Sequence, residues 1–301
     1  MDNRQSNLFQ IWFQAIRFPS LTAGLIPVML GGAFAVIDRA FQSVPFLLAL
    51  LGSMLLQAGT HLLNDYYDDL SGADRGEFVT GNAIQRGLLT PKQVYMAGLI
   101  CFLLALLPGL YLVTKVGSGV LWFGLAGFIL GYCYSGGPFP LAYRGFGEPA
   151  VFLAMGPLLV LATYFVQVGT IRWSVLLGSI PAGLLAAAIL HTNNLRDREQ
   201  DPSVGKITLA NLLTENNAKL TLAGLLAAAY AIQAILVLFG VIPLLALLPL
   251  LTLPIAVRVI RRAWTSQTPL EINLVLGLTV LLQLLFGMAY ALGLFASVLF
   301  M

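Results

Sequence analysis

The chain has 301 residues, of which 58% are hydrophobic and 10% are charged, and its formal net charge is +3. One water-soluble core of this size cannot bury so much apolar surface, so the composition excludes an ordinary soluble domain and favours a membrane protein. The Lys and Arg residues alternate with apolar runs and form no single basic face, so the charge does not indicate a nucleic-acid partner.

Apolar segments follow one another along the chain. Near the N-terminus, five apolar residues fall on one face of a helix: Leu8, Phe9, Trp12, Phe13 and Ile16. They fit either a short helix that lies in the membrane interface or a segment that simply leads into the first transmembrane span. From residue 18 onward, apolar runs of about 17 to 25 residues recur, each long enough to cross the hydrocarbon. They lie at 18–37, 45–64, 94–114, 118–135, 149–168, 173–194, 218–239, 241–257 and 272–299. We expect the first to be a retained span, because it lacks a small-residue cleavage signature.

The runs predict an all-α polytopic protein with nine transmembrane helices and its termini on opposite sides of the lipid bilayer. Of the sixteen Lys and Arg residues, only Arg39, Lys115 and Arg172 fall on one side, and the other thirteen share the side of the N-terminus. The positive-inside rule therefore predicts a cytoplasmic N-terminus, with the long loops 65–93 and 195–217 also in the cytoplasm. A bacterial inner or plasma membrane is the expected location.

Eight of the thirteen acidic residues fall within the stretches 65–77 and 195–201. Two solvated charged loops would be the plain explanation, but the spacing argues against it. Asn64 precedes Asp68 by four positions, and Asn193, Asp197 and Asp201 repeat that step. If the preceding spans continue as helices, each set shares one helical face, and the two faces can meet across a bundle.

The donor types indicate a metal and a phosphate. Hard oxygen ligands from Asn and Asp, without His or Cys among them, favour magnesium, and basic residues after each motif suit a diphosphate. The two His and two Cys residues show no zinc-ligand spacing. We therefore expect His61 and His191 to orient neighbouring groups.

Asn64-Asp65-Tyr66-Tyr67-Asp68 and the step from Asp197 to Asp201 resemble the N-D-x-x-D and D-x-x-x-D motifs of the intramembrane aromatic prenyltransferases, the UbiA superfamily. The resemblance covers essentially the whole chain. It implies one prenyltransferase domain over 1–301, with motif 1 near 64–74, motif 2 near 193–206, and a central chamber capped by cytoplasmic loops 2–3 and 6–7. Gly72 stands where the broader pattern has an Asp, which displaces the third acid to Asp74.

Within that superfamily, residues 134–148 and 193–210 resemble the enzymes that use 1,4-dihydroxy-2-naphthoate. The Leu-Lys-Arg element typical of relatives that use 4-hydroxybenzoate is absent. The resemblance implies magnesium-dependent transfer from a polyprenyl or phytyl diphosphate to dihydroxynaphthoate with decarboxylation, in menaquinone or phylloquinone biosynthesis. Another aromatic acceptor, 4-hydroxybenzoate or homogentisate, is the alternative. An ion-coupled transporter is a second one, although its acids would lie near mid-membrane.

The resemblance also assigns roles to residues. The expected metal ligands are Asn64, Asp68, Asp197 and Asp201, with Asp65, Asp74, Asn193 and Asn194 as weaker ligands or supporting groups. Helix capping is the alternative for Asp65 and Asn194. Expected diphosphate contacts are Arg17, Arg86, Arg196, Arg198 and Lys206, although Arg17 also suits a topology signal. The expected catalytic groups are Asp65, Asp68, Asp197, Asp201, Lys206 and Tyr143. Tyr66, Tyr67, Tyr134 and Tyr143 are expected to stabilise an allylic cation or to orient the acceptor, with an interfacial aromatic belt as the alternative.

Overall fold

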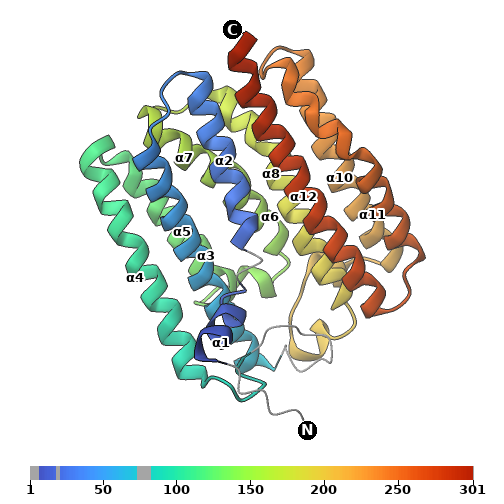
Figure 1. Cartoon of the computed structure of the whole chain (residues 1–301). Helices are drawn as coiled ribbons and strands as arrows, with labels where there is room; N and C mark the ends of the chain where they lie inside the picture. The colour runs from blue at the N-terminus through green and yellow to red at the C-terminus, as the bar shows by residue number, and fades with distance from the viewer. Residues whose placement is uncertain (1–6, 18–20, 73–82, 301) are drawn as a thin grey trace.

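The computed structural model of the chain describes residues 7–17, 21–72 and 83–300, and within these it is almost entirely helical. Long helices run side by side as a bundle, and the two termini lie at opposite ends of it (Figure 1). The longer helices are α1 (Leu8–Ala15), α2 (Thr22–Ile37), α3 (Ser43–Ser71), α4 (Pro91–Val116), α5 (Gly119–Ser135), α7 (Leu159–Val168), α8 (Trp173–Arg196), α10 (Glu215–Leu238), α11 (Leu253–Thr265) and α12 (Pro269–Ser297). The shorter ones are η2 (Leu141–Tyr143), α6 (Gly147–Leu153), η3 (Ala154–Leu158), η4 (Asp201–Val204), α9 (Leu209–Leu212), η5 (Leu244–Thr252) and η6 (Val298–Phe300).

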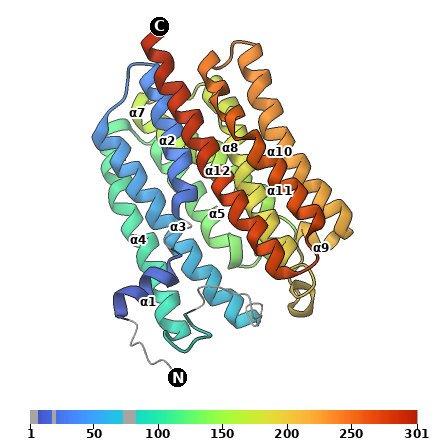
Figure 2. The ribbon, with the colours of Figure 1, turned by 45° about the vertical axis from the view of Figure 1, so that its right-hand side comes forward.

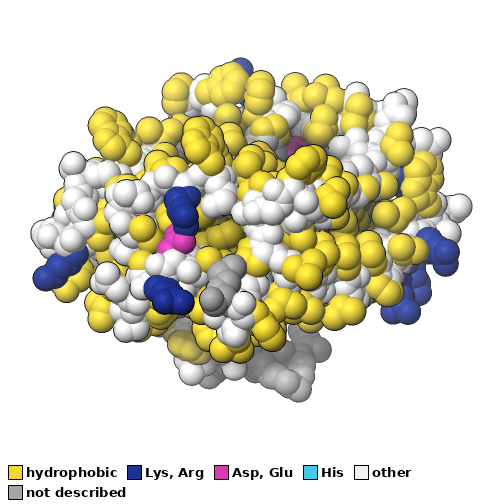
Figure 3. Space-filling view, turned by 90° about the horizontal axis from the view of Figure 1, so that it is seen from above, with side chains coloured by type: hydrophobic (Ala, Val, Ile, Leu, Met, Phe, Trp, Pro, Cys, Tyr) yellow, Lys and Arg dark blue, Asp and Glu magenta, His cyan; other side chains and the backbone are white. Residues whose placement is uncertain are grey.

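The helices match a membrane environment. Among the described residues, seven segments are long and apolar enough to cross a membrane, and two shorter apolar helices cover Gly24–Ile37 and Gly119–Ser135. Each of the nine apolar runs expected from the sequence overlaps one of these segments. Large apolar side chains point outward, as Trp122, Leu107 and Phe239 do. Figure 3 shows an end of the bundle on which hydrophobic side chains are abundant and charged ones few. The outward-facing apolar side chains along the helices suit lipid as the solvent.

Two expected spans are not uniform α-helices. The run at 149–168 contains a π-helical segment, η3, where Pro157 lacks the amide hydrogen that a regular α-helical turn needs. The run at 241–257 begins as the 3₁₀ segment η5, which contains Pro249, before α11 starts. Gly156 on η3 lets this irregular stretch approach α8, because a Cβ atom there would lie 2.8 Å from the Cα of Gly183. That close approach places α6 against the helix that carries motif 2.

The main core and a smaller one hold the parts of the site in place. The main core joins α2, α7, α8, α10 and α12 around buried side chains such as Tyr164, Phe286 and Tyr290. The smaller core packs Ala15 of α1 against Leu62 of α3 and Val94 of α4. Figures 1 and 2 both show α1 at the end of the bundle where α3 finishes, with the chain after α8 at the same end. Both acidic motifs therefore lie at one end of the molecule.

Candidate active site

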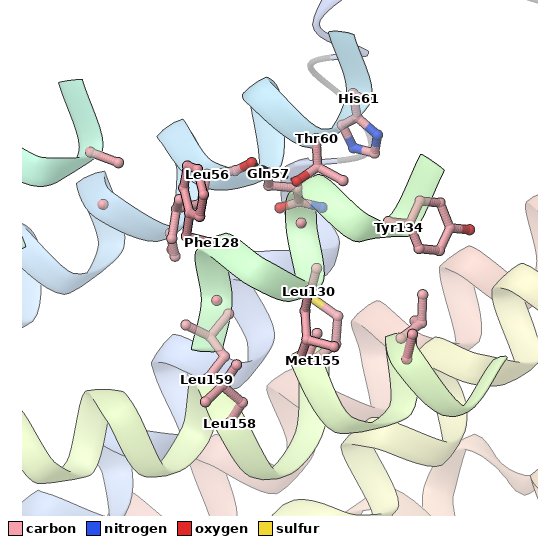
Figure 4. A pocket seen from close by; sticks show the side chains of 18 of the residues that line it. Leu56, Gln57, Thr60, His61, Phe128, Leu130, Tyr134, Met155, Leu158 and Leu159 are labelled. Carbon is pink, nitrogen blue, oxygen red and sulfur yellow. Dashed lines mark hydrogen bonds between the residues drawn. The ribbon is translucent and has the colours of Figure 1, made fainter. Parts of the chain in front are cut away.

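A cavity of about 1650 Å³ enters the bundle at the end that carries the motifs. Charged and amide side chains line this end and come from the segment after α1, the last turns of α3 and α8, the start of α12 and nearby loops: Arg17, Asn64, Asp68, Arg86, Asn193, Asn194, Arg196, Asp197, Lys206 and Asn273. The rest of the wall is mostly apolar and comes from α3, α4, α5, η3 and α7, with Leu56, Phe128, Leu130 and Leu159 among its residues (Figure 4). One continuous space thus joins a charged end to an apolar interior.

Motif 1 stays helical to its end, as the sequence predicted. Helix α3 continues to Ser71, and Gly72 then ends it in the left-handed region at φ 79°. Asn64 and Asp68 consequently share one face, and both line the cavity. The Asn64 amide donates to Ser135 Oγ at 2.8 Å, and the Tyr143 hydroxyl donates to Asp68 Oδ1 at 2.5 Å.

Asp65 plays a different part from its neighbours. It is buried and forms an ion pair with Arg17, while Arg17 itself lines the cavity. Arg17 adopts the left-handed conformation, φ 51°, just after α1 ends. Arg86 reaches the same mouth, where it donates to Gln14 Oε1 of α1 at 3.1 Å. Helix α1 therefore sets two cationic side chains at the charged end of the cavity.

Motif 2 differs from the expected geometry. Helix α8 ends at Arg196 with Asp197 as its C-cap, so Asp201 does not share a helical face with Asn193 and Asp197. The turn keeps Asp201 close, since its amide donates to the Asp197 carbonyl at 2.9 Å. Arg196 holds the Asp197 carboxylate with two hydrogen bonds of 2.6 Å, and Asn193 Nδ2 lies 3.4 Å from Asp197 Oδ2.

Lys206 lies among the acids of both motifs. Its ammonium is 3.4 Å from Asp201 Oδ1, while Asp201 Oδ2 is buried without a partner in the described part of the chain. Burial raises the pKa of Asp201 to about 6, with Lys206 opposing the shift and the charge of Asp197 adding to it. Burial lowers the pKa of Lys206, but the carboxylates of Asp68, Asp201 and Asp197 outweigh it, so this pKa is raised. Positive charge is thus strongly favoured at this point.

The loop after α5 connects the two motifs. Tyr143 lies in η2, and its carbonyl accepts the Ile207 amide at 3.1 Å, while the Gly145 amide donates to the Ile207 carbonyl at 2.8 Å. The Tyr143 hydroxyl bonds Asp68 of motif 1, and the Lys206 ammonium lies 6.0 Å from its ring centroid. Tyr143 therefore bridges motif 1 to the residues that follow motif 2.

Several predicted residues lie elsewhere. The Arg198 guanidinium donates to the carbonyls of Ala210 and Leu213, so it braces the loop and does not line the cavity. Tyr66 packs on Tyr95, and the Tyr67 hydroxyl is 3.4 Å from that of Tyr132. Neither ring lines the cavity. Tyr134 does line it, and Asp74 lies outside the described residues.

A buried polar cluster behind motif 2 was not predicted in this form. Glu148 Oε1 accepts Asn194 Nδ2 at 3.1 Å and lies 2.9 Å from His191 Nδ1. His191 Nε2 lies 2.9 Å from the Ala218 carbonyl. All three side chains are buried. Asn273 of α12, which accepts from Arg196 at 3.2 Å, was also missed. An isolated Asn within an otherwise apolar helix is the sequence signal that marks such a position.

Replacing Glu148 with Ala should destabilise the fold, because it leaves the buried side chains of His191 and Asn194 without their acceptor. A loss of about 1–3 kcal/mol is expected for each unsatisfied group. The measurement is SDS-induced unfolding of the protein in bicelles. Glu199→Ala, in an exposed turn of the same region, is the matched control and should change little. Equal stability of the two variants would contradict the structural role of Glu148.

The oxygen donors fit a hard divalent cation. Within the described ranges, no three or more His, Cys, Asp or Glu side chains are grouped so that they could hold a metal ion. Three of the acids instead have a protein cation beside them: Arg17 at Asp65, Arg196 at Asp197 and Lys206 at Asp201. The buried, unpartnered Asp201 Oδ2 and the cavity-lining Asp68, Asp197 and Asn64 are the ligand types that magnesium prefers.

Comparison with solved structures shows which fold the chain has. The chain superimposes on a UbiA homologue from Archaeoglobus fulgidus, bound to GPP and Mg²⁺, with a TM-score of 0.70 at 20% identity, covering 95% of this chain and 99% of that one. An apo UbiA homologue from Aeropyrum pernix K1 gives a TM-score of 0.67 at 15% identity, over 89% and 96% of the two chains. The fold is that of an integral, multi-pass membrane protein.

Residues 24–282 match the UbiA prenyltransferase family, so the chain belongs to this family and is a prenyltransferase. Two relatives are named 1,4-dihydroxy-2-naphthoate octaprenyltransferase. The one from Bacillus subtilis is 32% identical over 98% of this chain and 95% of its own, and the one from Escherichia coli is 31% identical over 99% of each. The mouse UbiA prenyltransferase domain-containing protein 1 is 33% identical over 93% of this chain and 82% of its own.

Proposed function

We propose that the enzyme transfers a polyprenyl group from its diphosphate to 1,4-dihydroxy-2-naphthoate, with magnesium bound and with loss of the carboxylate as CO2. The product class is a precursor of menaquinone, or of phylloquinone where the donor is phytyl diphosphate. The names of the two bacterial relatives support the choice of acceptor, since both relatives align over nearly the full chain.

The observation that carries this proposal is the continuity of the cavity. Its charged end brings Asn64 and Asp68 of one motif together with Asp197 and Lys206 of the other, and its apolar part extends along α3, α4 and α5. A polyprenyl diphosphate has the same two parts, a highly charged head and a long apolar tail. The aromatic acceptor then has to meet the carbon that joins them.

In the reaction, the allylic C–O bond breaks, diphosphate leaves with the bonding electrons, and a carbon of the electron-rich ring bonds to the prenyl group. The bond from the ring to the carboxylate then breaks, CO2 leaves, and its electron pair restores the aromatic ring. Asn64, Asp68, Asp197 and Asp201 would hold magnesium, which when bound supplies Lewis-acid stabilisation of the departing diphosphate. Arg17, Arg86, Arg196 and Lys206 neutralise the remaining negative charge of that group. The apolar wall around Leu56, Phe128 and Leu130 keeps water from the reactive cation.

The membrane arrangement is part of the proposal. Nine spans, with the N-terminus and both motif loops in the cytoplasm, put the charged mouth at the surface where a soluble acceptor and diphosphate can exchange. The apolar part of the cavity then lies at membrane depth, where an isoprenoid tail partitions from lipid. The distribution of Lys and Arg supports this orientation.

A panel of acceptors tests the proposed function directly. Purified enzyme with magnesium and octaprenyl diphosphate should prenylate dihydroxynaphthoate at least tenfold faster than 4-hydroxybenzoate or homogentisate, because its segments at 134–148 and 193–210 resemble the naphthoate enzymes. The product is measured by liquid chromatography and mass spectrometry, which also detects the loss of CO2. A preference for either other acceptor would reassign the enzyme within its family.

Gly109 and Gly124 allow a test of where the tail lies. Both line the cavity, and a Cβ atom built on either would meet no atom within 4 Å. A larger side chain therefore has space, and it improves helix propensity by up to about 1 kcal/mol. We expect Gly124→Phe to lower transfer from octaprenyl diphosphate at least tenfold relative to geranyl diphosphate, measured as the ratio of the two rates.

Gly224→Phe on α10 is the matched control for that variant. Gly224 also has open space around its Cβ position, but it does not line the cavity. This control should leave the ratio of octaprenyl to geranyl transfer unchanged. The same ratio in Gly124→Phe as in the wild-type enzyme would show that the tail takes another path.

A further inference from the structure

His61 lies where the charged end of the cavity meets its apolar part, and the proposed reaction does not yet use it. It is on α3, three residues before Asn64, and it forms part of the cavity wall. Figure 4 shows His61 on α3, near Thr60 of the same helix and Tyr134 of α5. Leu158 and Leu159 lie on the other side of the view. His61 is thus placed beside the ligand space.

No hydrogen bond joins His61 to the described part of the chain, and its Nε2 atom is buried. Leaving a buried polar group unpaired is unfavourable, and such groups in folded proteins almost always have partners. The other histidine shows this, because both nitrogens of His191 have protein partners. Thr60, the neighbour of His61 in the wall, bonds the Leu56 carbonyl of its own helix. A molecule in the cavity is the partner available to His61.

The position of His61 decides which part of the substrates it meets. Three residues of helix place it about 4.5 Å deeper than Asn64 along the axis of α3. The diphosphate belongs with the cations and acids beyond Asn64. The next wall residues inward, Leu56, Phe128 and Leu130, suit hydrocarbon. The reacting carbon of the donor, and so the ring of the acceptor within about 3–3.5 Å of it, lie between these two zones.

The hydrogen-bonding groups of the imidazole also indicate which substrate His61 contacts. A neutral imidazole offers one hydrogen-bond donor and one acceptor, which complements a ring hydroxyl, itself both donor and acceptor. A prenyl tail has no polar atom to offer, and a diphosphate is matched by the Arg and Lys side chains. Tyr134 of α5 lines the same cavity. The two side chains therefore frame a place for a hydroxylated aromatic ring.

We propose that His61 binds a ring hydroxyl of the aromatic acceptor and so helps to select hydroxynaphthoates. This inference rests on the proposed function, because it assumes that a hydroxylated aromatic acid enters the cavity. His61 acts here by contact with the substrate. Its contribution is expected in acceptor binding and not in donor binding.

The test uses full-length enzyme in detergent with magnesium, first with whichever acceptor the wild type prenylates. His61→Phe keeps a ring of similar size but removes both nitrogens. We expect it to raise the KM for dihydroxynaphthoate by roughly 10–100-fold while leaving the KM for octaprenyl diphosphate within about twofold. His61→Gln, which again presents a donor and an acceptor at similar reach, should recover most of this loss. Thr221→Val on α10 is the control, since its hydroxyl bonds the Asn217 carbonyl of its own helix and the residue does not line the cavity.

Equilibrium binding gives a second readout that does not depend on turnover. Wild-type enzyme should bind dihydroxynaphthoate more tightly than a naphthoate lacking one of the two hydroxyls, and His61→Phe should lose that difference for one of the two analogues. Unchanged acceptor KM and unchanged discrimination in folded His61→Phe would overturn the proposal. Wild-type transfer to another hydroxylated acid instead of dihydroxynaphthoate would revise the proposed function, and the same variants would then test His61 with that acid.

Discussion

Replacing Asp68 with Asn is expected to lower prenyl transfer by at least about a hundredfold while leaving the helical bundle folded. Asp68 is buried at the end of α3, lines the cavity and accepts the Tyr143 hydroxyl. Asn has nearly the same shape, and its carbonyl oxygen can still accept from Tyr143. What is lost is the negative charge, on which the binding of a hard cation depends.

The measurement is the rate of transfer to dihydroxynaphthoate over a range of magnesium concentrations, with the far-UV circular dichroism of the variant as a check on folding. Asp69→Asn is the matched control. Asp69 is the next residue of the same helix, yet it does not line the cavity. Near-normal turnover in Asp68→Asn, or an equal loss in Asp69→Asn, would contradict the assignment of motif 1 as the metal-binding face.

The sequence predicts motif 1 well because one physical rule governs it. A regular helix puts Asn64 and Asp68 on one face, and Gly72 is placed to end that helix through its left-handed conformation. The same rule could have separated Tyr66 from the site, since a step of two residues puts it on the opposite face of α3 from Asn64. Helical periodicity was therefore sufficient here, provided that it was applied to every residue of the motif.

Motif 2 is less predictable because its chain leaves the helix. Helix α8 ends at Arg196, and the 3₁₀ turn η4 begins at Asp201, where Pro202 restricts the residue before it and lacks an amide hydrogen. The direction of Arg198 then depends on that turn, which aims it at the carbonyls of Ala210 and Leu213. Neither contact can be derived from local spacing.

Long-range pairing is the other part that the sequence does not specify. Tyr143 meets Asp68, and Glu148 meets His191 and Asn194, across large separations along the chain. Each pair forms because two helices or loops pack side by side. The composition and periodicity of one segment do not determine which other segment packs against it. Several of the groups named from the sequence, such as Asn64, Asp68 and Asp197, line the cavity, and the packing of the bundle determines their partners.

Replacing Lys206 with Met should have the second large effect, because it removes the cation that lies nearest to Asp201 and in the field of Asp68 and Asp197. Met keeps much of the length and apolar stem of Lys. Removing one partner of a largely buried ion pair costs about 3–5 kcal/mol when nothing replaces it. Without magnesium, the variant should therefore unfold at a lower temperature than the wild-type enzyme. Transfer should also fall about a hundredfold, because the departing diphosphate loses a stabilising charge.

Magnesium separates the two roles of Lys206. A bound cation can offset the repulsion among the three acids, so added magnesium should raise the unfolding temperature of Lys206→Met more than that of the wild-type enzyme. The catalytic loss should persist at saturating magnesium, because the metal does not restore the ammonium beside the diphosphate. Lys92→Met, an exposed position at the start of α4, is the control and should match the wild type in both measurements. The metal and Lys206 are both expected to offset the negative charge of the same three carboxylates. If magnesium raised the unfolding temperature of Lys206→Met and of the wild-type enzyme equally, these carboxylates would not form one site.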